Sequence, residues 1–189
     1  MKYPEPSACI SILEERGLKE NVLKHVKAVH RFAVVIGSRL IEQGHRINMD
    51  LLEAGALLHD IGRTKSHKLD HAVVGCKIAA ELGFPDDLIN IIRNHIGAGI
   101  YKKEAAEIGL PYEDYIPETI EQKIVAAADN LALGHKLQTI EQFVNNLKQK
   151  GVTEGAERSL DLHMELSEMC GIDLDELLKI KADARLATT

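Results

Sequence analysis

Several features that mark common protein classes are absent or scarce in this chain. Its 189 residues contain no tryptophan, and aromatic residues make up only 4% of the total. Scarce aromatics, together with abundant Ala, Leu, Ile, Glu and Lys, favour helix over strand. The three cysteines, Cys9, Cys76 and Cys170, are far apart and show no CxxC spacing. The sequence therefore argues against a disulfide framework or a thiolate zinc site, and it suits a reducing cytoplasm.

Long apolar runs and an excess of positive charge are also missing. No apolar stretch reaches the roughly 18 residues that a membrane span needs. Residues 1–6 carry no apolar region of the signal-peptide type. The net charge of −6 argues against a large positively charged surface that binds nucleic acid, although it allows a local basic pocket. We therefore expect a cytoplasmic protein that spans no membrane and does not bind DNA.

What is present is a helical pattern along almost the whole chain. Between Glu20 and Gln43 the apolar residues recur at intervals of three and four, which is typical of one buried helix face. Asp50 and Asp70 are expected to cap two helices, and Thr119 is expected to open a third. Loops are expected at 63–69 and 111–116. The same reasoning predicts an all-α fold with helices over 7–16, 20–43, 50–60, 70–82, 85–96, 120–133, 139–150, 153–169 and 173–184.

Several histidines and aspartates fall on the apolar faces of these helices. His59 and Asp60 end an apolar run, and Asp129 is surrounded by small apolar residues. A lone inward histidine is most simply explained as a core residue with one hydrogen-bond partner. Several such residues from five helices would each need a separate partner, whereas one shared cation would satisfy them all. Imidazole and carboxylate ligands suit Mn, Fe, Co, Ni or Zn. The expected metal ligands are His25, His59, Asp60, His71, His95 and Asp129.

The other histidines lack this inward pattern. His30, His45, His135 and His163 are expected to be structural or solvated. His67 lies in the loop after Asp60 and is close enough in sequence to reach the site.

The ordered set His25, His59-Asp60 and Asp129 resembles the signature of the HD-domain metal-dependent phosphohydrolases. The stretch His59-Asp60-Ile61-Gly62 looks like the HDIG variant of that signature. The resemblance covers about residues 20–135, and it implies an HD-domain helical bundle over 1–137. Residues 138–189 are then a C-terminal helical extension packed on the same domain. By the same resemblance, one divalent ion is bound by the four residues of the signature, His25, His59, Asp60 and Asp129. A second ion is bound by His71 and His95, and Asp60 bridges the two ions.

The resemblance implies hydrolysis of a phosphate ester or anhydride by metal-activated water, with one or two divalent ions (Mn, Fe, Co, Ni, Zn or Mg). No GYP motif is present, which disfavours cyclic-di-GMP as the substrate. Residues 70–99 are also similar to bacterial symmetric dinucleoside-tetraphosphate hydrolases, so a nucleotide or dinucleotide is expected. Asp60 is a catalytic candidate, and Arg63, Lys65 and His67 are candidates to neutralise phosphate charge.

Three other interpretations remain open at this stage. The same six ligands could serve a di-iron oxygenase, or the pocket could be a nucleotide sensor without turnover. The chain could also be a helical interaction protein that binds no metal. The expected partner is a small phosphorylated molecule, and a homodimer is among the assemblies that the sequence allows.

Overall fold

The fold is all-α, with a single two-stranded hairpin in the part of the chain that the structure describes. The structure is a computed structural model that describes the backbone of residues 2–186 and the side chains of residues 2–181. The elements are α1 (Pro6–Glu15), α2 (Glu20–Glu42), α3 (Met49–Leu58), the 3₁₀ helix η1 (Ile61–Thr64), α4 (His71–Glu81), α5 (Asp86–Asn94), α6 (Lys102–Glu107), α7 (Ile120–Asn130), β1 (Ala132–Leu133), β2 (Lys136–Leu137), α8 (Ile140–Gln149), α9 (Thr153–Cys170) and α10 (Leu174–Leu186).

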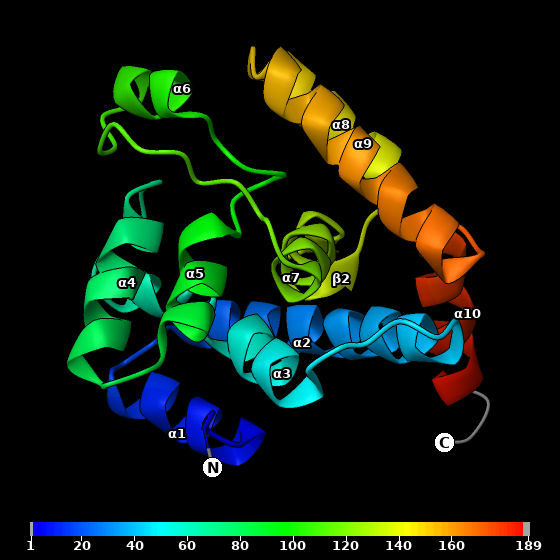
Figure 1. Cartoon of the computed structure of the whole chain (residues 1–189), viewed down its shortest axis with the longest axis horizontal. Helices are drawn as coiled ribbons and strands as arrows, with labels where there is room; N and C mark the ends of the chain where they lie inside the picture. The colour runs from blue at the N-terminus through cyan, green and yellow to red at the C-terminus, as the bar shows by residue number, and fades with distance from the viewer. Residues whose placement is uncertain (1, 187–189) are drawn as a thin grey trace.

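The long helix α2 runs across the molecule, with α1 on one side of it and α5 and α7 on the other (Figure 1). Helices α3 and α7 pack on it, while α4 and α5 pair at one side. The residues of α2 that the sequence predicts to face inward are all buried: Val22, Val26, Val29, Ala33, Ile36 and Leu40. Because α3 and α7 both pack against α2, side chains far apart in the sequence come together there.

The C-terminal helices add to the same apolar core. Helix α9 contacts α2 and α7, and α10 packs against α2 near its C-terminal end. The buried residues Leu166, Cys170 and Leu178 belong to the same cluster as the residues of α2. The division between the two parts at residue 137 stays a prediction.

Four details of the local structure differ from the sequence prediction. Residues 61–64 form η1 rather than a loop, and the short helix α6 occupies a segment that had no predicted helix. The predicted helix 120–133 ends at Asn130, after which β1 and β2 form an antiparallel hairpin around Gly134. Helix α3 begins earlier than predicted, because the side chain of Asn48, not Asp50, accepts a hydrogen bond from the backbone of Leu51.

Two of the predicted caps can be compared directly with the structure. Thr119 caps α7, as expected, by accepting a hydrogen bond from the Gln122 backbone. Asp70 occupies the expected position before α4, but its carboxylate makes no cap bond and accepts instead from the Ser66 hydroxyl.

Candidate metal centre

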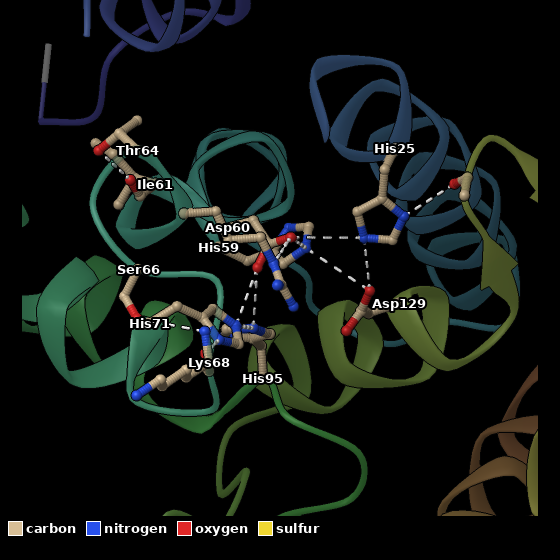
Figure 2. Close-up of polar contacts among 12 residues, drawn as sticks. His25, His59, Asp60, Ile61, Thr64, Ser66, Lys68, His71, His95 and Asp129 are labelled. Carbon is tan, nitrogen blue, oxygen red and sulfur yellow. Dashed lines mark hydrogen bonds and ion pairs between the residues drawn. The ribbon is translucent and has the colours of Figure 1, made fainter. Parts of the chain in front are cut away.

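Six predicted side chains converge where α2, α3, α4, α5 and α7 meet (Figure 2). His25 projects from the second turn of α2, and Asp129 from the last turn of α7. The helix ends supply the others: His59 and Asp60 follow α3, His71 begins α4 and His95 follows α5. His59, Asp60, His71 and His95 are each at most 2% exposed. The fold therefore gathers the whole predicted set, with only the His25 and Asp129 side open to solvent.

Asp60 lies at the middle of this cluster. Its Oδ1 atom is 3.0 Å from Nε2 of His71 and 3.6 Å from Nε2 of His95. Its Oδ2 atom is 3.8 Å from Nε2 of both His25 and His59. The two oxygens therefore face different pairs of imidazoles, which is the placement of a carboxylate between two adjacent sites.

Asp129 completes the second of these groups. Its Oδ1 atom is 2.9 Å from Nε2 of His25 and 3.7 Å from Nε2 of His59. The donor atoms of His25, His59 and Asp129 lie within 4.8 Å of one another, and so do those of His59, Asp60 and His95. Both groups therefore have dimensions that fit a metal ion.

Backbone carbonyls fix the orientation of all four histidine rings. Each carbonyl can only accept, so the Nδ1 atom that faces it carries the proton, and the lone pair of a neutral ring is left on Nε2. In every case Nε2 points into the cluster. The contacts are His25 Nδ1 to Gly134 O (2.9 Å), His59 Nδ1 to Ala56 O (2.8 Å), His71 Nδ1 to Lys68 O (2.6 Å) and His95 Nδ1 to Ile92 O (2.7 Å).

This arrangement leaves unprotonated ring nitrogens facing one another and facing carboxylate oxygens, all of which are hydrogen-bond acceptors. Nε2 of His71 lies 3.0 Å from Nε2 of His95, although both rings already hold their proton on Nδ1. Within the described residues, Nε2 of His59 and Oδ1 of Asp60 are buried with no hydrogen-bond partner. Buried polar atoms rarely stay unpaired, and a cation would satisfy these lone pairs together. The residues present therefore fit one or two divalent ions.

The pKa values show how the cluster holds its charge. Burial opposes the charged form of His25, but its contact with the Asp129 carboxylate, the nearby Asp60 charge and the Gly134 carbonyl together outweigh burial and raise the pKa of His25 to about 9. Burial also opposes ionisation of Asp129, but the hydrogen bond from His25 and the surrounding histidines together outweigh burial and lower the pKa of that carboxyl to about 2. Burial lowers the pKa of His59 to about 4, so that ring is neutral. Burial opposes ionisation of Asp60, but the surrounding histidines together overcome burial and hold the pKa of Asp60 well below its usual range.

The glycine of the HDIG-like stretch sets the approach of α4. A Cβ atom built on Gly62 would lie 1.9 Å from the backbone oxygen of His71 and 2.7 Å from the backbone nitrogen of Gly75. Both neighbours are backbone atoms and cannot rotate away. The absence of a side chain at Gly62 therefore lets His71 come within reach of Asp60.

Of the three residues predicted to neutralise phosphate charge, Arg63 contacts the cluster directly. The Nε atom of Arg63 donates a hydrogen bond to Oδ2 of Asp60 at 2.6 Å. Arg63 is half-buried, whereas Lys65 and His67 are exposed on the segment that follows η1. Arg63 thus contacts the central carboxylate directly, which the sequence did not indicate.

Two of the remaining histidines make specific contacts. His30 pairs with Glu53 at 2.9 Å, in keeping with the expected structural role. His163 is buried, and its Nε2 atom lies 3.1 Å from Asp173. His163, Asp173 and Asp175 form a further group of donor atoms within 4.8 Å of one another. The sequence did carry a signal for this burial, since His163 lies on the same helical stripe as the buried residues Ala156, Ser159, Leu166 and Cys170.

Comparison with known families decides where the chain belongs. The HD domain matches residues 22–134, which contain all six converging side chains. The chain is a member of the HD-domain family. An HD relative, the uncharacterized protein MJ0778 of Methanocaldococcus jannaschii, is 44% identical over 131 residues, covering 69% of this chain and 78% of that protein.

Some relatives are longer and contain additional sequence outside the region that matches this chain. The tRNA (cytidine(56)-2'-O)-methyltransferase of Thermoplasma volcanium is 42% identical over 92% of this chain, which spans 50% of that protein. Ribonuclease Y of Acidothermus cellulolyticus is 29% identical over 78% of this chain and 27% of its own length. The chain thus spans about half or less of these two relatives.

A solved structure has the same HD fold. The HD domain of the L. monocytogenes phosphodiesterase PgpH matches with a TM-score of 0.59 and 17% identity, over 94% of this chain and 98% of that domain. None of the helices described here combines the length and the apolar character needed to cross a bilayer.

Proposed function

We propose that this chain is a metal-dependent phosphohydrolase that acts on a phosphate ester or anhydride. The observation that carries the proposal is the inward lone pairs at the centre of the cluster: Nε2 of His59 and Oδ1 of Asp60 are buried and unpartnered within the described residues. Membership of the HD family and the ribonuclease and phosphodiesterase relatives support the same class of reaction.

The proposed ligands form two groups that share Asp60. His25, His59 and Asp129 would hold one divalent ion, and His71 and His95 the other. Such ions lower the pKa of bound water and withdraw charge from a phosphoryl oxygen. The metal could be Mn, Fe, Co, Ni, Zn or Mg, of which the first five suit these donors best.

The chain's own residues supply orientation and charge. The backbone carbonyls behind the four histidines hold Nε2 inward, so the ligands need little rearrangement. Arg63 neutralises Asp60 and keeps its carboxylate in place. Lys65 and His67 lie on the exposed segment beyond η1, where they could contact the phosphate of an arriving substrate.

A nucleotide or dinucleotide is the proposed substrate. The family of hydrolases that the sequence resembles and the names of the relatives support it, because ribonuclease Y acts on RNA and the PgpH domain was crystallised with cyclic-di-AMP. A short RNA is the second candidate, which the tRNA methyltransferase relatives also favour. A cytoplasmic location and a homodimer also stay predictions.

The direct test is a metal analysis of protein purified without chelator, followed by a turnover screen. The screen uses nucleotides, dinucleoside polyphosphates, cyclic dinucleotides and short RNA with each of the six metals. We expect bound metal and metal-dependent release of phosphate or a nucleotide. Asp60→Ala should lose both the metal and turnover while it keeps its helical circular dichroism.

Other outcomes separate the alternatives. Full activity in Asp60→Ala would disprove the proposal. Oxygen consumption by the iron-loaded protein without phosphate release would indicate an oxygenase. Nucleotide binding without turnover under any metal would indicate a sensor, and an absence of bound metal would favour a helical interaction protein.

A further inference from the structure

The residue directly after Asp129 is a buried asparagine that the proposed reaction does not use. Asn130 is 2% exposed and is the last residue of α7. Its Nδ2 atom donates a hydrogen bond to the backbone oxygen of Gly97 at 3.2 Å. A buried amide or carbonyl group that loses its partner costs free energy, so this bond holds the two segments together.

Gly97 lies in the turn that follows His95 at the end of α5. The turn is closed by a hydrogen bond from the Gly99 nitrogen to the Ile96 oxygen at 3.0 Å. Gly97 itself has a φ of +61°, a conformation that favours glycine. On the other side of the turn, Nδ1 of His95 donates to the carbonyl of Ile92. The position of the Gly97 carbonyl is therefore linked closely to that of the His95 ring.

The backbone of Asn130 has a second link, to the β1–β2 hairpin. The Nε2 atom of Gln138 donates a hydrogen bond to the backbone oxygen of Asn130 at 2.8 Å. The same hairpin supplies the Gly134 carbonyl that faces Nδ1 of His25 (Figure 2). Asn130 thus contacts both the turn behind His95 and the hairpin that orients His25.

These two links matter because the two groups of proposed ligands adjoin each other. The ring of His59 lies between them, with its centroid 5.5 Å from that of His25 and 4.9 Å from that of His95. The two oxygens of Asp60 face one group each. A shift of α5 relative to the end of α7 would change the separation of the groups while every ligand stayed present.

We propose that Asn130 is a positioning residue that sets the spacing of the two proposed metal sites. It supplies no ligand and acts through the Gly97 carbonyl and the hairpin. The inference rests on the proposed function in assuming that two ions bind. A further bond, from Nδ2 of Asn94 to Oε1 of Gln122 at 3.0 Å, joins α5 to the first turn of α7. Loss of the Asn130 contact should therefore shift the ligand end of α7 without separating the helices.

The test replaces Asn130 with leucine, which has a similar size and no donor. Wild-type and Asn130→Leu proteins are titrated with Mn²⁺ alone, and the loaded proteins are examined by electron paramagnetic resonance. We expect two bound ions with a spin-coupled signal in the wild type. In Asn130→Leu one ion should bind roughly tenfold or more weakly, as for other residues that support metal ligands. The coupled signal should give way to that of isolated ions.

A matched control separates this role from a general loss of stability. Thr119→Ala removes the side chain that caps α7, at the opposite end of the helix from Asp129. This variant weakens the same helix and should keep the coupled signal. Gln138→Met removes the link to the hairpin at a half-buried position, and it should weaken Mn²⁺ binding less than Asn130→Leu does. Circular dichroism and thermal unfolding check that each variant folds.

An unchanged coupled signal in folded Asn130→Leu would overturn this proposal. If that variant does not fold, unchanged Mn²⁺ affinity in Gln138→Met would overturn it. Equal losses in Asn130→Leu and Thr119→Ala would do so too, and so would isolated ions in the wild type. A coupled pair without any hydrolysis would contradict the proposed function and leave the role of Asn130 intact.

Discussion

Two clusters in this molecule are built from the same residue types, histidine and aspartate, but differ in their hydrogen-bond patterns. In the cluster around Asp60, every histidine donates Nδ1–H to a backbone carbonyl and turns Nε2 inward. In the C-terminal cluster, Nδ1 of His163 has no partner within the described residues, and Nε2 faces Asp173. The first cluster turns its imidazole lone pairs toward the carboxylates, whereas in the second the ring nitrogen that faces the carboxylate can donate to it and the lone pair lies on the other nitrogen.

The carboxylates differ in the same way. Asp173 accepts hydrogen bonds from the backbone N–H groups of Asp175 and Glu176, and Asp175 accepts from Ile140. Both therefore satisfy the first turns of helices α10 and α8, where N–H groups have no partner within the helix. Short distances between histidine and aspartate do not by themselves distinguish a metal site from a helix cap. The distinguishing feature is the hydrogen-bond partner of the other ring nitrogen, the one that faces away from the carboxylate.

The largest expected effect in this comparison comes from Gly62→Ala. The new methyl group would press on the backbone of α4 and move His71 away from Asp60 without removing a ligand. We expect a destabilisation of about 1–3 kcal/mol, typical of an overpacked site, and roughly tenfold or greater loss of metal affinity. Denaturant unfolding and metal titration measure the two effects.

Gly155→Ala is the matched control for this change. Gly155 lies in α9, the helix that carries His163, and the new Cβ atom would meet side-chain atoms of Val152 and Arg158 and no backbone atom of another helix. This variant should bind metal like the wild type. Wild-type metal affinity in Gly62→Ala would show that the approach of α4 does not set the geometry of the centre.

An intermediate effect is expected from pH. With a pKa of about 9, His25 is protonated at neutral pH in the absence of a cation, and that proton must leave before Nε2 can bind metal. Metal affinity should therefore rise by about tenfold per pH unit between pH 7 and 9, the slope for release of one proton. Competition with a chelator of known protonation measures this slope, and a flat profile would contradict it.

The stability of the metal-free protein should fall as pH rises, whereas its metal affinity should rise. The raised pKa of His25 stabilises the fold most fully below the unfolded value of 6.5, and this contribution is lost as pH rises through about 9. Thermal unfolding across this range, with and without metal, tests the sign.

The smallest effect is expected from Asp173→Ala. Loss of the two backbone contacts at the start of α10 should cost about 1 kcal/mol, as for other N-cap substitutions. Burial opposes ionisation of Asp173, but the contact with His163 and the backbone N–H groups of Glu176 and Asp175 together outweigh burial and lower the pKa of Asp173. The contribution is therefore present above the unfolded value of 3.8 and lost as pH falls below it. Metal content should not change, and a loss of bound metal in this variant would assign the C-terminal cluster to a metal.

The sequence was sufficient to predict most of the helices. Periodicity placed His25, His71 and His95 on buried faces, whereas the resemblance to HD-domain hydrolases, and not the spacing alone, supplied the expectation that the six side chains converge. The same patterns predicted the buried stripe of α2.

The rest depends on backbone atoms and short elements that leave no pattern in the sequence. Carbonyl groups orient the histidine rings, and any residue type supplies a carbonyl. The hairpin has two-residue strands, and α6 has six residues, so neither is long enough to show a period.

The six proposed ligands come from five helices, and this would have a consequence for biosynthesis. In the sequence, His25 precedes and Asp129 follows the remaining four residues, so no short segment of the nascent chain carries the full set. The cluster is complete only after α7 has docked on α2. We therefore expect a partly folded chain to bind metal poorly, so that the metal content of a preparation would measure how much of the protein has reached its final structure.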